Sequence, residues 1–169
     1  MTLADFTQTG LIVPHLQGRD ATSVIHELSL VLQRTGIVPD MLPFYHAALT
    51  REFLLSTDFE SGIAYPHARL PGIKSLAFAF GHSDEPFAWS PRFIHPVRLV
   101  FLLAVPATDS TNYLPLLSGL ARLSADNRLL EALRETHDAA RICGIFSQVS
   151  LRASLPAEPA AQGAPHPSR

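Results

Sequence analysis

The sequence predicts an α/β fold in which helices flank a mixed β-sheet on both faces. Its segments follow the order helical, extended and helical again, which fits a mixed sheet covered by helices better than a strict alternation of strands and helices. The most apolar run, 97–105, suits a strand at the sheet centre. With 169 residues, 47% of them hydrophobic, the chain can bury a full core. We expect one domain over residues 1–151.

The first part of the chain predicts one short strand and two helices. Residues 10–13 form a short apolar segment that is typical of an edge strand. Asp20 is a candidate helix N-cap, apolar residues then recur at helical spacing, and Gly36 ends that helix. A second helix is expected at about 40–55, where Pro43 is tolerated because it lies in the first turn.

The middle of the chain predicts strands and the last third predicts helices. Residues 62–65 and 75–81 are expected to be strands, and a loop rich in proline, serine and acidic residues, 82–96, precedes the apolar strand. Three helices are expected afterwards, at 112–123, 124–134 and 136–149. Ser124 is the candidate N-cap of the second of them. Residues 152–169 are rich in alanine and proline, which predicts a disordered tail.

Charge and composition limit the classes of partner. A formal net charge of −2 gives no general attraction to nucleic acid or to an anionic membrane surface, which favours a protein or small-molecule partner. Cys143 is the only cysteine, so no intrachain disulfide can form. No export signal is apparent, and no stretch reaches the roughly 18 uninterrupted apolar residues of a membrane helix. We therefore expect a cytoplasmic protein without direct membrane insertion.

The candidate chemistry centres on the dipeptide Pro66-His67. Proline fixes its own φ and restricts the residue before it, so a histidine that follows it at a strand end is held rigidly. A neutral imidazole has one nitrogen with a free lone pair, so histidine can act as a nucleophile without an external base, and phosphohistidine is the natural product. Arginine neutralises the charge of a transferred phosphoryl group. Arg51 and Arg69 are the candidates, and Arg51 is the stronger one.

The segments around this dipeptide resemble a known family. They are Arg51-Glu52, Ser56-Thr57, the run from Gly62 to His67, the apolar run Leu99–Pro106 and the leucine-rich run Leu114–Leu123. In this order, and over roughly residues 5–150, the chain is similar to the mannitol/fructose-type enzyme IIA domain of the phosphotransferase system, including its nitrogen-regulatory branch. The passage from Arg-Glu to Pro-His is the specific part of the resemblance. The resemblance implies the enzyme IIA fold.

The resemblance also implies a function for His67. It would accept a phosphoryl group from a histidine phosphocarrier protein and pass it to a IIB domain, or use it as a regulatory signal, with Arg51 assisting. The family usually has a second histidine where this chain has Asn112-Tyr113, and Tyr113 is a possible replacement because its hydroxyl can donate a hydrogen bond. The family commonly has glycine after the active histidine, whereas Ala68 resists a positive φ. No cofactor is expected.

Other interpretations stay open. Arg51 could pair with Glu52 or interact favourably with the helix C-terminus. Ser56 and Thr57, candidate binding residues together with Arg69, are equally typical of a helix end. The fold could also serve as a regulatory protein-binding module with little or no phosphorylation, a version for which the absence of an attached IIB-like or membrane segment leaves room. The sequence decides neither a sugar nor the oligomeric state.

Metal binding and serine hydrolase chemistry are disfavoured. A metal site would have to use His82, Asp84, Glu85 and His95, whose spacing matches no recurrent ligand pattern. A hydrolase of the Ser-His-Asp type is disfavoured because the chain contains no GxSxG sequence.

Overall fold

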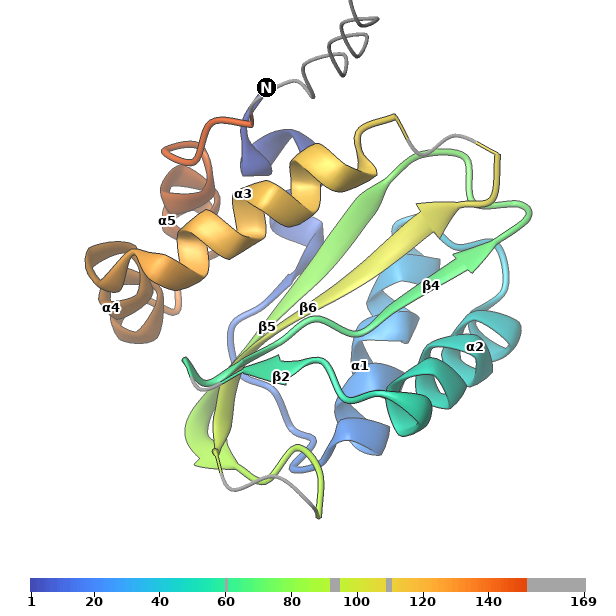
Figure 1. The fold of residues 1–169 in the computed structure, drawn as a ribbon, viewed down its shortest axis with the longest axis horizontal. Coiled ribbons are helices and arrows are strands. Elements are labelled where there is room, and N and C mark those ends of the chain that lie inside the picture. The colour runs from blue at the N-terminus through green and yellow to red at the C-terminus, as the bar shows by residue number, and fades with distance from the viewer. Residues whose placement is uncertain (60, 92–94, 109–110, 152–169) are drawn as a thin grey trace, which may run out of the picture.

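A computed structural model describes residues 1–59, 61–91, 95–108 and 111–151. Its middle layer is a mixed sheet with α1 and α2 on one face and α3, α4 and α5 on the other (Figure 1). The strands are β1 (Ile12–Val13), β2 (Asp58–Phe59), β3 (Ile63–Ala64), β4 (His67–Leu70), β5 (Ala77–Phe87) and β6 (Val97–Pro106). The helices are α1 (Ala21–Arg34), α2 (Met41–Leu54), α3 (Tyr113–Ala125), α4 (Asn127–Glu135) and α5 (Ala139–Phe146), preceded by the 3-10 helices η1 (Leu3–Phe6) and η2 (Thr9–Leu11). The fold class predicted from the sequence is confirmed.

Strand β6 organises the sheet. It pairs antiparallel with β5 along one edge and parallel with β3 and then β4 along the other, while β1 and β2 form the outer positions of the order β1-β5-β6-β3-β2. Nine of the ten residues of β6 are buried, because helices cover both faces of the sheet at this strand. The predictions of a central strand here and of an edge strand near residues 10–13 are confirmed.

The alternation of side chains along β6 divides the interior into two cores. Leu99, Phe101 and Leu103 belong to the core under α3, α4 and α5, while Val100 and Leu102 belong to the core under α1 and α2. One continuous apolar run therefore supplies both layers. None of the described helices is long and apolar enough to span a bilayer.

The first two helices begin where the sequence predicts. The Asp20 carboxylate accepts a hydrogen bond from the Ser23 amide (2.8 Å), and the Asp40 carboxylate accepts one from the Leu42 amide (3.2 Å). Each aspartate satisfies an amide that has no partner inside its helix. Pro43 lies in the first turn of α2, as expected.

The predicted N-cap at Ser124 is wrong. Ser124 lies inside α3, where its hydroxyl donates to the carbonyl oxygen of Leu120 one turn earlier (2.9 Å). The helix continues to Ala125, and Asp126 caps α4 by accepting from the amide of Leu129 (3.1 Å). Serine and aspartate are both good caps, so only the position of the chain reversal distinguishes them.

Two strand predictions need correction. Strand β5 continues to Phe87 through the first part of the expected loop 82–96, because His82 pairs with Leu99 and Phe87 pairs with Val97 on either side of a register shift. His67 begins β4 instead of ending a strand. Proline has no N–H to donate, so Pro66 interrupts the ladder between β3 and β4, and its carbonyl still accepts from the Leu103 amide (2.9 Å). The predicted tail, 152–169, lies outside the described residues.

Candidate functional site

His67 is held at the start of β4 with one ring nitrogen engaged and the other available. Its Nδ1 lies 3.1 Å from the carbonyl oxygen of Tyr65. A carbonyl can only accept, so Nδ1 carries the proton and the lone pair of the neutral ring is on Nε2. In the described part of the chain, Nε2 has no hydrogen-bond partner. The half-buried imidazole is therefore presented as a nucleophile through Nε2.

Two hollows meet at His67. The larger, of about 630 Å³, lies between the C-terminal end of α2, the segment from β2 to the start of β4, and the length of α3. The smaller, of about 280 Å³, lies over β4. Three side chains line both hollows: Arg51, His67 and Tyr113. The residues that the sequence singled out from three separate segments are thus brought together.

The three side chains come from different elements. Tyr113 is the first residue of α3, and its ring centroid lies 6.4 Å from that of His67. Because β4 continues past His67, Arg69 lies on the same face of the strand, and its guanidinium carbon is 5.3 Å from the Tyr113 ring centroid, in a cation–π contact. Arg51 lies in the last turn of α2, and its guanidinium makes no hydrogen bond or ion pair within the described residues.

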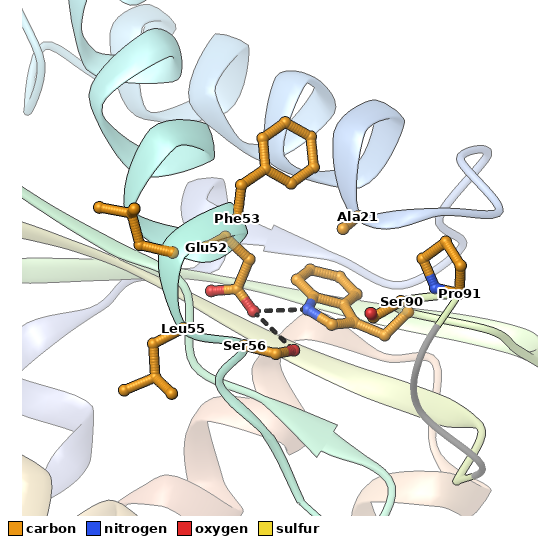
Figure 2. Close-up of a pocket in the computed structure, with 9 residues that line it drawn as sticks. Ala21, Glu52, Phe53, Leu55, Ser56, Ser90 and Pro91 are labelled. Carbon is orange, nitrogen blue, oxygen red and sulfur yellow. Dashed lines mark hydrogen bonds between the residues drawn. The ribbon is translucent and has the colours of Figure 1, made fainter.

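The interpretation that Arg51 pairs with Glu52 is wrong, because Glu52 points into the protein. The Glu52 side chain is 5% exposed and accepts hydrogen bonds from the Trp89 indole N–H (2.7 Å) and the Thr57 amide (2.7 Å). Figure 2 shows this carboxylate reaching the indole nitrogen and the Ser56 hydroxyl at the edge of a hollow of about 480 Å³. The alternative that the positive charge of Arg51 interacts favourably with the C-terminal end of the α2 dipole is compatible with its position in the last turn.

Glu52 is connected to His67 through hydrogen bonds. The Thr57 hydroxyl donates to Glu52 (2.9 Å) and accepts from the Tyr65 amide (3.0 Å), and the Tyr65 carbonyl accepts from His67. Glu52 thus fixes the backbone that determines the tautomer of His67. This role of Glu52 was not predicted from the sequence, although the spacing of Phe44, Ala48 and Glu52 places the carboxylate on the buried face of α2.

These observations make the comparison with known proteins informative. A family model described as "Phosphoenolpyruvate-dependent sugar phosphotransferase system, EIIA 2" matches residues 5–149. The chain belongs to this family. The resemblance found in the sequence is therefore confirmed. The relatives of this chain include both sugar phosphotransferase components and nitrogen regulatory proteins.

Two relatives illustrate this range. The nitrogen regulatory protein of Bradyrhizobium diazoefficiens is 28% identical over 148 residues, which are 87% of this chain and 95% of that protein. The fructose-specific EIIABC component of the phosphotransferase system of Bacillus subtilis is also 28% identical over 148 residues. That match covers 88% of this chain but 23% of the EIIABC component, so the chain spans less than a quarter of this relative.

Solved structures show the same enzyme IIA fold. The nitrogen regulatory protein IIA-Ntr of Neisseria meningitidis matches with a TM-score of 0.73 and 25% identity, over 85% of this chain and 98% of that one. Enzyme IIAMTL of Escherichia coli, solved in complex with phosphorylated enzyme IIBMTL, matches with a TM-score of 0.70 and 18% identity, over 84% and 97% of the two chains.

Ala68 is compatible with the enzyme IIA fold. It lies in β4 opposite Ala104, its side chain is buried among the residues under α1 and α2, and no described residue other than glycine has a positive φ. The extended backbone at this position therefore requires no glycine.

Ser56 and Thr57 form part of the wall of the larger hollow. Both line the larger hollow, but the Ser56 hydroxyl donates to Asp58 and Glu52, and the Thr57 hydroxyl is engaged with Glu52. Because both hydroxyls are engaged with carboxylates of the protein, these two residues shape the wall of the hollow.

The larger hollow is also lined by a pair of hydroxyl groups, those of Tyr65 and Ser124, that was not predicted from the sequence. The Tyr65 hydroxyl is hydrogen-bonded to Ser124, and burial raises the pKa of Tyr65 to about 12. The phenol is therefore neutral at physiological pH. It ties Tyr65, the residue between β3 and β4 whose carbonyl anchors His67, to helix α3.

Proposed function

We propose that this enzyme IIA domain is a phosphoryl carrier, in which Nε2 of His67 accepts the group from a histidine phosphocarrier protein. The observation that carries the proposal is the hydrogen bond from Nδ1 to the Tyr65 carbonyl, because it leaves the lone pair on Nε2. The Nε2 lone pair forms the new N–P bond as the N–P bond of the donor phosphohistidine breaks, and the bonding electrons return to the donor imidazole. Transfer to a IIB domain or to a regulated protein reverses this step.

Arg51 and Arg69 are proposed to stabilise the transferred group. Both line a hollow that contains His67, and charge-assisted hydrogen bonds from a guanidinium suit the equatorial oxygens of a phosphoryl group. Arg51 needs to break no existing ion pair within the described residues to do so. Tyr113 is proposed to donate through its hydroxyl at the position for which the sequence resemblance implies a second histidine.

The surface around the site supports docking of a protein partner. Large apolar side chains stand exposed at the end of α2, on β2 and at the start of α3: Phe53, Leu54, Leu55, Phe59 and Leu114. Such a surface buries apolar area when a partner covers the histidine. We propose that donor and acceptor proteins dock here in succession.

Intact mass measurement tests the carrier function. The protein is incubated with phosphoenolpyruvate, enzyme I and the histidine phosphocarrier protein, and its mass is read under non-acidic conditions. We expect a gain of one phosphate in the wild type and in His46→Gln, an exposed histidine on α2, and no gain in His67→Gln. A gain that persists in His67→Gln would refute His67 as the acceptor.

A regulatory binding module is the second candidate function. It is favoured by one observation: the Arg69 guanidinium is engaged with the ring of Tyr113, the residue at the position for which the sequence resemblance implies a second histidine. In this second function the protein would bind partners through the same docking surface without transfer of a phosphoryl group through His67. A folded wild-type protein that gains no phosphate from any cognate carrier would favour it.

A further inference from the structure

A cluster of histidine and aspartate side chains lies away from the phosphoryl site. Strand pairing places His67 beside Leu103 of β6 and His82 beside Leu99, on opposite edges of β6 and about 13 Å apart along it. Near His82, the side chain of Asp84 meets His15 and His137. These three belong to the segment before α1, to β5 and to the α4–α5 connection.

The three side chains offer a compact set of ligand atoms. Asp84 Oδ1 lies 2.8 Å from His15 Nδ1 and 3.1 Å from His137 Nε2, and all three atoms lie within 4.8 Å of one another. Between 39% and 55% of each side chain is exposed, so an ion and its water ligands can reach the cluster. Two imidazoles and one carboxylate are a ligand set that zinc and similar transition ions bind.

Ring stacking holds His137 between His15 and His82. The His137 ring stacks on His15 on one side (4.5 Å between centroids, 5° between planes) and on His82 on the other (4.6 Å, 13°). His82 is fully buried, so it forms a fixed floor under His137.

The rings must adjust before they can share an ion. Because the His15 and His137 rings are parallel, their nitrogen lone pairs lie in separate planes, and His15 has to turn about its side-chain bonds. Its exposure allows this turn. Because the Asp84 carboxylate can only accept, neutral His15 carries its proton on Nδ1 and neutral His137 carries its proton on Nε2. Each proton moves through solvent to the other nitrogen of its own ring, which frees His15 Nδ1 and His137 Nε2 for the ion without a change in net protonation.

The nearby arginine does not occupy the carboxylate. Arg98 donates to the backbone carbonyls of Ser83 (3.3 Å) and Asp84 (3.1 Å), not to the Asp84 side chain. The carboxylate is therefore left to the two imidazoles.

We propose that His15 Nδ1, Asp84 Oδ1 and His137 Nε2 form a binding site for a zinc-type divalent transition ion. The bound ion links three chain segments that are far apart in the sequence and stabilises the folded protein, because the separated segments of an unfolded chain bind it less well. No metal site was predicted from the sequence, because the spacing of Asp84 with His82, Glu85 and His95 matches no recurrent ligand pattern. The two histidines that meet Asp84 are separated from it by 69 and 53 residues.

Zinc titration tests the site. Metal-free protein at pH 7.5 is titrated with ZnCl₂ by calorimetry, with MgCl₂ as the control for a cation that prefers oxygen ligands. We expect one zinc site in the wild type, and a loss of affinity of at least about tenfold in His15→Gln, Asp84→Asn and His137→Gln. His46→Gln and His67→Gln retain this site, which separates it from adventitious binding and from the phosphoryl site.

A second measurement identifies the ligand atoms. Nitrogen-15 spectra of the imidazoles should show zinc-dependent shifts at His15 Nδ1 and His137 Nε2, and circular dichroism should show that the metal-free variants are folded. Zinc should raise the thermal midpoint of the wild type but not of Asp84→Asn. Equal zinc affinity in wild type, Asp84→Asn and His137→Gln would overturn the proposal, as would an absence of zinc binding by the wild type.

Discussion

The buried carboxylate of Glu52 provides a quantitative test of how the site is built. Glu52→Ala leaves two N–H donors without their acceptor, the Trp89 indole and the Thr57 amide, while the Thr57 hydroxyl, which also donates to Glu52, can rotate toward another acceptor. An unsatisfied buried donor costs about 1–3 kcal/mol. Glu52 borders a hollow of about 480 Å³, so water replaces part of the lost bonding and the lower half of that range applies. We expect Glu52→Ala to lower the free energy of unfolding by about 3 kcal/mol.

Glu52→Gln is the matched variant. Its amide oxygen can accept from the Trp89 and Thr57 N–H groups, and its NH₂ can donate to the Thr57 hydroxyl oxygen, so the loss should stay within about 1 kcal/mol. Urea unfolding followed by circular dichroism measures both variants, with Glu85→Ala as the control for loss of an exposed acid. Glu52→Ala should also slow phosphorylation of His67, since the connection through Thr57 and Tyr65 is lost.

Two outcomes would contradict this reasoning. If Glu52→Ala were within about 1 kcal/mol of the wild type, the carboxylate would not be the acceptor on which these donors depend. If Glu52→Gln were as unstable as Glu52→Ala, the negative charge and not the hydrogen-bond pattern would be the stabilising feature.

Three further predictions concern His82, Ala68 and Tyr113. Burial, reinforced by the charges of His137 and Arg98, lowers the pKa of His82 to about 4, so the unfolded chain binds a proton below about pH 6.5 that the folded protein does not. Its contribution to stability should fall by at most about 3 kcal/mol as the pH drops from 6.5 to 4, and urea unfolding of His82→Leu should show a shallower dependence over that range. Ala68→Gly should lose about 0.5–1 kcal/mol in urea unfolding without accepting phosphate faster, because β4 is already extended there; a faster rate would contradict this. Tyr113→Phe keeps the ring against Arg69 but should lower the initial rate of phosphohistidine formation about tenfold, and an unchanged rate would exclude a catalytic hydroxyl.

Local chemistry made much of the fold predictable. Aspartate at positions 20 and 40 caps a helix wherever apolar residues follow at helical spacing, because the cap satisfies amides of its own first turn. The apolar run of β6 had to be buried on both faces. The motif residues Arg51 and His67 could likewise be chosen as candidates from the sequence, since their chemistry belongs to the residue types and their order.

Other features depended on partners that are distant in the chain. The first part of the predicted loop 82–96 became part of β5 because β6 was available to pair with it, and β4 formed because the same strand had a free edge beyond Pro66. Ser124 was as good a cap as Asp126 until the end of α3 was known. Backbone pairing across the sheet contributes more than local preference in such segments.

The sequence by itself determined the family, the main elements and the residue types that suit phosphoryl transfer, because those follow from motifs and local periodicity. Only the tertiary structure decided which nitrogen of His67 is available, that Glu52 supports it from inside, and that His15 and His137 converge on Asp84. Each of these depends on distances between segments that are far apart in the sequence. Packing of the completed sheet and its helices sets those distances, and spacing along the chain does not.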